Sequence, residues 1–271
     1  MNQSKIWTLL CFLALATPAA YGQMKGWELG GWVGGSNYFG DLNTEWRINR
    51  THPAGGIAVR YNFNDRLALR FGYAMGSISA YDSDSKNIFE QTRNLHFRSL
   101  IADGSAVLEF NFLSYVHGHK EYYYTPYVLV GPAFYYFNPQ AQLNGTWYNL
   151  REYGTEGQFR GEEYNTTQAA IAYGLGMKID LSYRWSLNFE ISGRKLFTDY
   201  LDDVSGVYAD VDDILAQRGE IAAALSDPSF EPKIGEAGKQ RGNGKNNDMY
   251  VVAGVGLVYY FGQIRCPDFV R

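Results

Sequence analysis

Eight segments of the chain alternate apolar side chains with small or polar ones, and this period of two limits the fold more than any other feature. Successive side chains of a strand point to opposite faces of a sheet, so each segment predicts a strand with one apolar face. Pro132 lies inside the fifth segment, and because proline cannot donate to a strand ladder we expect a bulge there. The eight segments are residues 27–35, 57–63, 67–76, 97–112, 127–137, 171–179, 185–194 and 249–261.

The alternation alone does not decide which face looks outward, because a soluble lipocalin-like barrel turns the same apolar face inward. Short links at residues 64–65 and 181–184, with a moderate one at 117–121, alternate along the chain with long links. Short turns at one end and long loops at the other are typical of outer-membrane barrels. The long links are residues 37–52, 79–96, 138–166 and 195–247.

Hydropathy and aromatic content agree with a barrel that crosses a membrane. Beyond the N-terminus no run of about 18 apolar residues occurs, so a helical span is excluded. Aromatic residues cluster at strand ends, as at 122–124, 135–137 and 259–261, where they suit the two membrane interfaces. The sequence therefore predicts an all-β fold, an eight-stranded antiparallel transmembrane β-barrel with short periplasmic turns and long extracellular loops.

The N-terminus carries the features of an export signal. Lys5 precedes an apolar stretch, and small residues precede Gln23. These features predict a cleaved signal peptide over residues 1–22 and a barrel domain over residues 23–271. The mature chain would keep a single cysteine, Cys266, which leaves no partner for an internal disulfide.

The inward face of the predicted barrel carries four bases and four acids. Charges in a low-dielectric interior are tolerated only when they are paired, and an eight-stranded interior is just wide enough to be filled by side chains. We therefore expect a salt-bridged plug, and a barrel that serves as an anchor or docking platform instead of a pore. The eight residues are Glu28, Arg60, Arg70, Asp103, Glu109, Lys178, Glu190 and Arg194.

Several classes of function find no support in the sequence. Lys and Arg number 24 against 28 Asp and Glu, a net charge of −4, which argues against a nucleic-acid partner. There is no nucleophile elbow, phosphate-binding loop or paired-cysteine zinc pattern, and we expect no cofactor. His117 and His119 lack a third metal ligand nearby, which favours a solvated periplasmic turn. Asp82 and Asp84 lack the other positions of a calcium loop and are expected to be solvated.

The last long link contains an acidic segment followed by a helical pattern. Asp199, Asp202 and Asp203 either bind calcium or cap the helix predicted at residues 210–225, and capping is favoured because it needs no ion. Residues 229–248 contain Gly, Lys, Asn and Pro in a pattern that predicts a mobile loop.

Several short motifs, in order along the chain, resemble those of the PorG-type outer-membrane barrels of the Bacteroidetes type IX secretion system. They are residues 37–43, 137–139 with 154–158, 198–205, and the Cys-Pro-Asp-Phe of residues 266–269. The resemblance spans essentially the whole mature chain. The matching positions, which are candidates for a structural role, are Gly40, Asp41, Leu42, Gly154, Thr155, Glu156, Gly157, Thr198, Asp199, Tyr200, Asp202 and Asp203.

This resemblance implies a non-enzymatic protein of the outer membrane of a Gram-negative bacterium. It would sit in outer-membrane lipid and bind a periplasmic lipoprotein and a ring protein of the secretion machinery. Such partners reach only the short turns and the chain termini, so the C-terminal tail with Cys266 is the candidate partner contact. Two other classes stay open. One is a small OmpX-like surface barrel whose long loops bind ligands, and the other is a barrel enzyme with His96 and the Asp82 and Asp84 pair as its best candidates.

Overall fold

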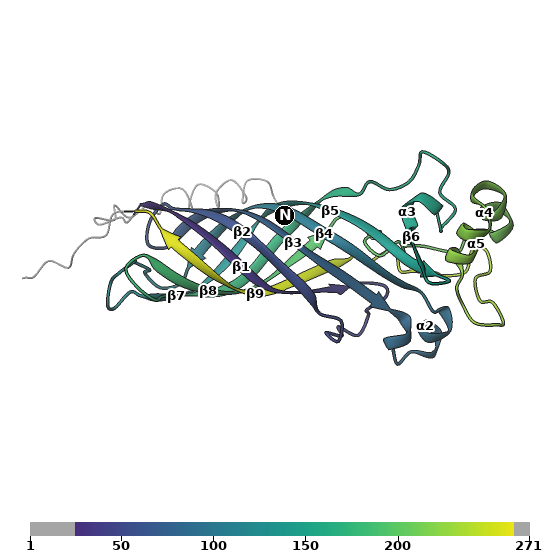
Figure 1. The fold of residues 1–271 in the computed structure, drawn as a ribbon, viewed down its shortest axis with the longest axis horizontal. Helices are drawn as coiled ribbons and strands as arrows, with labels where there is room; N and C mark the ends of the chain where they lie inside the picture. The colour runs from purple at the N-terminus through teal and green to yellow at the C-terminus, as the bar shows by residue number, and fades with distance from the viewer. Residues whose placement is uncertain (1–24, 263–271) are drawn as a thin grey trace, which may run out of the picture.

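The strands of this protein form one sheet that closes on itself, as the computed structural model of residues 25–262 shows (Figure 1). Neighbouring strands run antiparallel in the order β4, β3, β2, β1, β9, β8, β7, β5, and pairing between β4 and β5 completes the circle. The prediction of an all-β, eight-stranded antiparallel barrel is confirmed. The barrel strands are β1 (Gly26–Phe39), β2 (His52–Asn62), β3 (Leu67–Tyr81), β4 (His96–Asn111), β5 (Tyr124–Leu143), β7 (Thr167–Asp180), β8 (Trp185–Leu196) and β9 (Met249–Tyr260).

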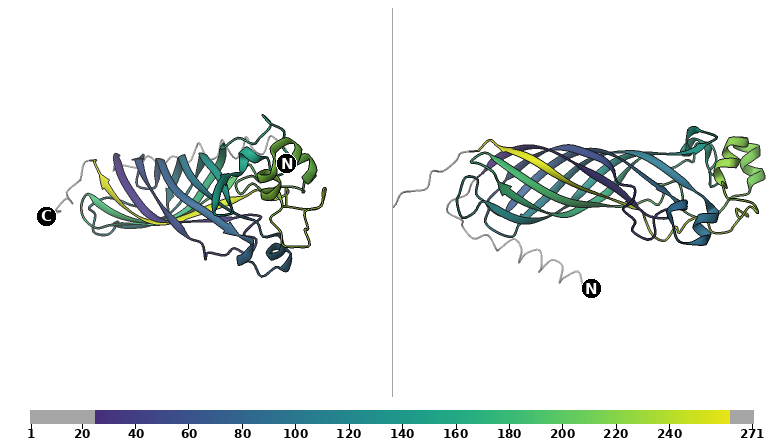
Figure 2. Two further views of the ribbon diagram at one scale, coloured as in Figure 1. Left: turned by 45° about the vertical axis from the view of Figure 1, so that its right-hand side comes forward. Right: turned by 60° about the horizontal axis from the view of Figure 1, so that its bottom comes forward.

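Short and long connections alternate at the two ends of the barrel, as predicted (Figure 2). We call the end with residues 63–66, 112–123 and 181–184 the turn end. The opposite, loop end carries four long connections that include one short strand and five short helices. The connections are residues 40–51, 82–95, 144–166 and 197–248. Their elements are η1 (Asp82–Asp84), α2 (Ile88–Arg93), β6 (Thr146–Asn149), α3 (Leu150–Tyr153), α4 (Val211–Arg218) and α5 (Glu220–Ser226). The predicted signal peptide and Cys266 lie outside the described residues.

Several strands extend further toward the loop end than the sequence pattern indicates. β5 has 20 residues, and its last four pair with β6 in place of β7, while Gln140 still pairs with Arg98 of β4. The outward side chains change there from apolar to Asn138, Gln140 and Gln142. The apolar alternation therefore ends while the strand continues.

Pro132 does not create the predicted bulge. The residue register between β4 and β5 is the same on both sides of it, from Ser105 opposite Ala133 to Leu108 opposite Val130. The two intervening residue pairs drop out of the ladder, whereas pairing with β7 continues through Pro132. The neighbouring Gly131 allows close approach, because a Cβ there would lie 2.1 Å from the Ala106 carbonyl oxygen. The missing proline donor is thus accommodated by a local gap in the ladder.

The outward face of the barrel is apolar, whereas the inward face combines small, polar and aromatic side chains with aliphatic ones such as Ile101. Val33, Ile57, Leu175 and Ile191 each expose more than half of their surface on the outside. On β4, β5 and β8, most of the alternate residues are buried inside the barrel. The predicted assignment of faces is therefore correct for these strands.

The long connection of residues 197–248 differs from its predicted form. The single helix expected at residues 210–225 is two helices, α4 and α5, separated at Gly219, whose φ is +89°. The segment predicted to be mobile is fixed in this structure by a bridge between Val207 and Gln240 and by hydrogen bonds to Tyr208 and Gly206. Within residues 25–262, no helix has the length and apolar character needed to cross a membrane.

Candidate functional site

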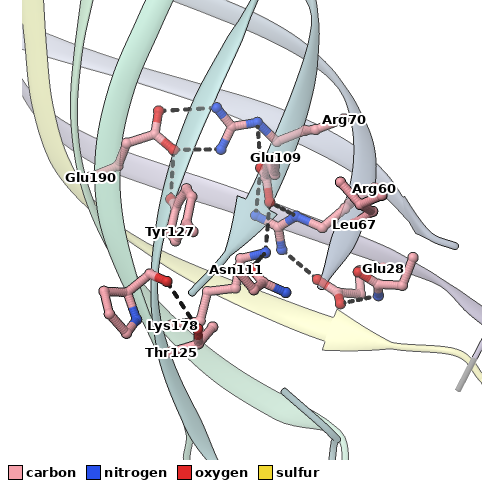
Figure 3. A network of polar contacts seen from close by, with 12 residues as sticks. Glu28, Arg60, Leu67, Arg70, Glu109, Asn111, Thr125, Tyr127, Lys178 and Glu190 are labelled. Atoms are coloured by element: carbon pink, nitrogen blue, oxygen red, sulfur yellow. Dashed lines mark hydrogen bonds and ion pairs between the residues drawn. The ribbon is translucent and has the colours of Figure 1, made fainter. Parts of the chain in front are cut away.

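Six of the eight inward charges form one connected set of ion pairs near the turn end, which we call the lumen network (Figure 3). Glu109 lies at its centre. Its carboxylate is 2.8 Å from Nε of Arg60, 3.2 Å from Nε of Arg70 and 2.6 Å from Nζ of Lys178. The members are Glu28, Arg60, Arg70, Glu109, Lys178 and Glu190.

The network balances three cations with three carboxylates. Arg60 and Arg70 lie directly opposite each other on β2 and β3, an arrangement that repels unless carboxylates separate the charges. Glu28 pairs with Arg60, and Glu190 lies 2.5 Å from Arg70. Tyr127 donates a further hydrogen bond of 2.7 Å to Glu190. Because each buried charge has an opposite partner, the desolvation cost of the set is offset.

The moderate connection of residues 112–123 folds into the barrel mouth beneath this network. The ring of His117 lies 3.0 Å from Glu28 and 3.0 Å from Asp180, and it stacks on Tyr260 at a centroid distance of 4.3 Å. Burial opposes the charged form of His117, but contacts with Asp180 and Glu28 raise its pKa to about 9. The expectation of a solvated turn is wrong for His117. The sequence around His117 predicts an exposed side chain, because it does not show that residues 112–123 fold into the barrel mouth.

The remaining two inward charges form a separate pair closer to the loop end. Nε of Arg194 lies 3.3 Å from Asp103, and Tyr250 donates a hydrogen bond of 3.0 Å to the same carboxylate. A cavity of about 60 Å³ separates this pair from the lumen network, room for a few water molecules. Beyond it, toward the loop end, buried residues such as Ile101, Tyr135 and Phe137 fill the lumen. Described side chains thus fill the barrel on both sides of the cavity.

The loop connections form a cap whose interior contains a cluster of carboxylates that lies over β1. We call Asp41, Asp199, Asp202 and Asp248 the acid cluster; all four are buried. The Tyr38 hydroxyl lies 2.5 Å from Asp202 and 3.0 Å from Asp248. One hydroxyl has a single proton to donate, so holding both contacts requires a protonated carboxyl on the other side.

Burial is the main cause of the high pKa values in the acid cluster. It raises the pKa of Asp202 and of Asp248 well above the usual range, and neighbouring carboxylates raise both further. Burial and the nearby Asp41 also raise the pKa of Asp199 to about 7. Over residues 25–262, no group of three or more His, Cys, Asp or Glu residues is arranged to hold a metal ion.

Two buried arginines connect the loops around the acid cluster. Arg93 pairs with Asp82 at 2.7 Å and donates to the backbone carbonyl of Asp41 at 3.0 Å. Arg241 pairs with Glu156 at 3.0 Å and donates to the carbonyl of Asp203 at 2.6 Å. The expectation that Asp82 is solvated is therefore wrong, because the sequence does not show Arg93 eleven residues later as its partner.

The positions that match the resemblance motifs come together in this cap from three separate connections. Asp203 accepts hydrogen bonds from Thr155 and, at 2.7 Å, from Tyr164. Gly40 is needed for space, since a Cβ there would lie 1.9 Å from an Asp248 oxygen. The other positions pack around them. Leu42 and Thr198 are buried, Gly154 and Gly157 have positive φ, and Tyr200 stacks on Tyr164.

The favoured reading of Asp199, Asp202 and Asp203 as helix caps is wrong. Asp210 caps α4 by accepting a hydrogen bond of 2.9 Å from the Asp212 amide, while the three acids lie inside the cap. The candidate residues for an enzyme, His96 with Asp82 and Asp84, each have a different structural partner. His96 accepts from the Gln142 amide at 2.9 Å and stacks on Tyr81, whereas Asp84 pairs with Arg50.

Sequence reasoning missed the cap residues Arg93, Tyr164, Arg241 and Asp248, and it included Tyr38 only as part of the motif of residues 37–43. A signal exists for two of them. Tyr38 continues the inward phase of β1, and Asp248 continues the inward phase of Tyr250 on β9. The two arginines and Tyr164 lie in connections with no periodic pattern.

A sequence profile of a family described as a domain of unknown function, DUF6089, matches residues 4–216. The chain belongs to the DUF6089 family. A search of curated proteins finds none that matches. The DUF6089 description names no activity, so function has to be inferred from the lumen and the cap.

Solved barrels resemble this DUF6089 chain at a distance. The N-terminal β-barrel domain of Pseudomonas aeruginosa OprF has a TM-score of 0.39 and 12% identity, covering 88% of this chain and 100% of that chain. Yersinia pestis Ail, the attachment invasion locus protein, in complex with the heparin analogue sucrose octasulfate, has a TM-score of 0.44 and 9% identity, covering 88% of this chain and 99% of that chain. The P. aeruginosa outer membrane protein OprG has a TM-score of 0.42 and 11% identity, covering 89% of this chain and 99% of that chain. The fold assignment itself rests on the strand pairing of this chain.

Proposed function

We propose that this protein spans the outer membrane of a Gram-negative bacterium and serves there as a non-enzymatic anchor for protein secretion. The observation that carries the proposal is a barrel with an apolar outer wall and a lumen filled by paired charges. The apolar wall suits lipid, and the filled lumen suits an anchor better than a pore.

The outer wall supports the membrane part of the proposal. On β5 the outward residues from Tyr124 to Tyr136 are all apolar, aromatic or proline, and the next outward residue is Asn138. This stretch of 13 residues exceeds the roughly 9–11 that a tilted transmembrane strand needs. Exposed aromatic residues such as Trp27 and Trp185 lie at the turn end, where a membrane interface would be.

The proposed orientation places the turn end in the periplasm and the loop cap outside the cell. Short turns on the periplasmic side are the usual arrangement in such barrels. The resemblance to PorG-type barrels then suggests a role in the type IX secretion system, with a periplasmic lipoprotein and a ring protein as partners. The described surface open to them includes Tyr122, Tyr123 and Tyr183, which are exposed on the turns. Cys266, the other predicted contact, lies outside the described residues.

The test is gentle detergent extraction of outer membranes with a tagged protein, followed by mass spectrometry of what stays bound. We expect a lipoprotein and a ring component with the wild type. Tyr183→Ser should reduce their recovery, whereas Phe159→Ser, which removes a similarly exposed ring at the loop end, should not. A barrel recovered alone, together with normal secretion after its deletion, contradicts the secretion role.

The ordered cap favours a second candidate function, a surface barrel whose loops bind an external ligand. Its loops are joined by buried ion pairs, and it exposes apolar side chains such as Trp46, Ile88 and Phe159. Proteolysis of the loops on intact cells separates the two candidates. Loss of ligand binding with normal secretion supports the surface barrel.

A further inference from the structure

The outward charges of the barrel wall are few and of one sign. Along the outward-facing positions of the eight barrel strands, all within the described residues, there is no Asp or Glu. The charged side chains at these positions are Arg98 on β4 and Lys195 on β8. Every carboxylate of the barrel strands belongs to the inward face. The outer wall therefore presents only positive charge to its surroundings.

Both cations lie where the apolar band ends toward the loops. Arg98 is two residues beyond Leu100, the last outward apolar residue of β4, which is about 7 Å along a strand. Lys195 pairs with Ile171 and Met249, which close the apolar band on the other side of the barrel. In a membrane-spanning barrel this height is that of the lipid headgroups.

The planar guanidinium of Arg98 is held in place for an anion that accepts two parallel hydrogen bonds. Its guanidinium carbon lies 3.6 Å from the centroid of the Trp147 ring, and its Nε donates to Gln140 at 3.2 Å. In the part of the chain that the structure describes, no carboxylate lies within 4 Å of its nitrogens. The nearby Arg50 differs, because Asp84 neutralises it. The two terminal NH₂ groups of Arg98 can therefore donate a pair of hydrogen bonds to two oxygens of one phosphate.

We propose that Arg98, supported by Trp147, binds the phosphate group of a lipid in the outer leaflet. The proposal rests on the membrane location proposed above. Continuity with the apolar band argues for a lipid over a free anion, since acyl chains would lie on Leu100 and Tyr136 directly below the guanidinium. The aromatic ring under Arg98 fixes it at the interface and reduces the entropy lost on binding.

The experiment measures lipid retention by the full-length protein in detergent, using native mass spectrometry. The probes are phosphatidic acid, diacylglycerol with the same acyl chains, and inorganic phosphate as a competitor. Wild type should retain phosphatidic acid about tenfold more than diacylglycerol, the scale of a charge-assisted hydrogen bond. Arg98→Gln should remove this preference, and Arg98→Lys should keep part of it through its charge. Arg160→Gln removes an exposed loop arginine and should change nothing.

The outcomes separate this inference from the proposed function. Equal retention by wild type and Arg98→Gln overturns the lipid site, as does inorganic phosphate displacing the lipid at comparable concentration. Failure of the wild type to insert into phosphatidylcholine vesicles, measured by protease protection, contradicts the membrane location instead. Heat-dependent migration in gels checks that each variant keeps its folded barrel.

Discussion

Replacing Glu109 with glutamine removes a carboxylate that contacts three cations in the lumen network. Three cations would then face two carboxylates. Lys178 would keep a contact of 3.1 Å with Asn111 and the faces of Tyr127 and Tyr115, whose ring centroids lie 4.7 Å and 5.9 Å from Nζ. Removing one partner of a buried ion pair costs about 3–5 kcal/mol, because the remaining charge is left desolvated without compensation. We therefore expect Glu109→Gln to lower the free energy of unfolding by that amount.

The assay is equilibrium urea unfolding in lipid vesicles, followed by tryptophan fluorescence. Glu236→Gln is the control, since the exposed pair of Glu236 with Lys239 should contribute less than about 1 kcal/mol. Adding Lys178→Met to Glu109→Gln should recover part of the loss by restoring the charge balance, a coupling that a double-mutant cycle measures. If Glu109→Gln and Glu236→Gln destabilise equally, the lumen network does not stabilise the fold as argued.

Three further predictions concern the cap and the barrel mouth. The pKa of Asp199 is raised from its usual 3.8 to about 7, so the folded state binds a proton that the unfolded state has lost. The free energy of unfolding should therefore fall as the pH rises from 4 to 7, by up to about 1.4 kcal/mol per pH unit. An unchanged slope in Asp199→Asn would refute this. The pKa of His117 is raised from 6.5 to about 9, so its contribution is present below pH 6.5 and is lost up to pH 9; His117→Gln should flatten that part of the same curve. Gly40→Ala should speed proteolysis of the loops without changing heat-dependent migration of the barrel, because its Cβ would collide with Asp248 and Tyr38; equal cleavage rates would show that the cap tolerates the methyl group.

The barrel could be predicted from the sequence because its constraint repeats every two residues. The outward positions of β3, such as Leu67, Phe71 and Met75, show the pattern directly. Across the barrel strands together, the inward positions include all eight charges that the sequence predicts there. Which charges pair could not be predicted, since pairing depends on the stagger between strands. Glu109 meets Lys178, 69 residues away, while Asp103 meets Arg194.

The cap was not predictable from the sequence for a different reason. Its contacts join residues far apart in connections without periodicity, such as Tyr38 with Asp248, 210 residues apart. Acidic loop residues are usually solvated, so the sequence predicts an exposed Asp82, whereas the structure pairs it with Arg93. The resemblance motifs marked much of the cap interior, but not the arginines that hold it together.

The most direct test of the sealed outer-membrane anchor is conductance across a planar lipid bilayer that contains the purified protein. Insertion is established first by protease protection and heat-dependent migration. The filled lumen predicts an inserted barrel without discrete conductance steps. Stable unitary steps from the inserted wild type would show an open pore and contradict the account.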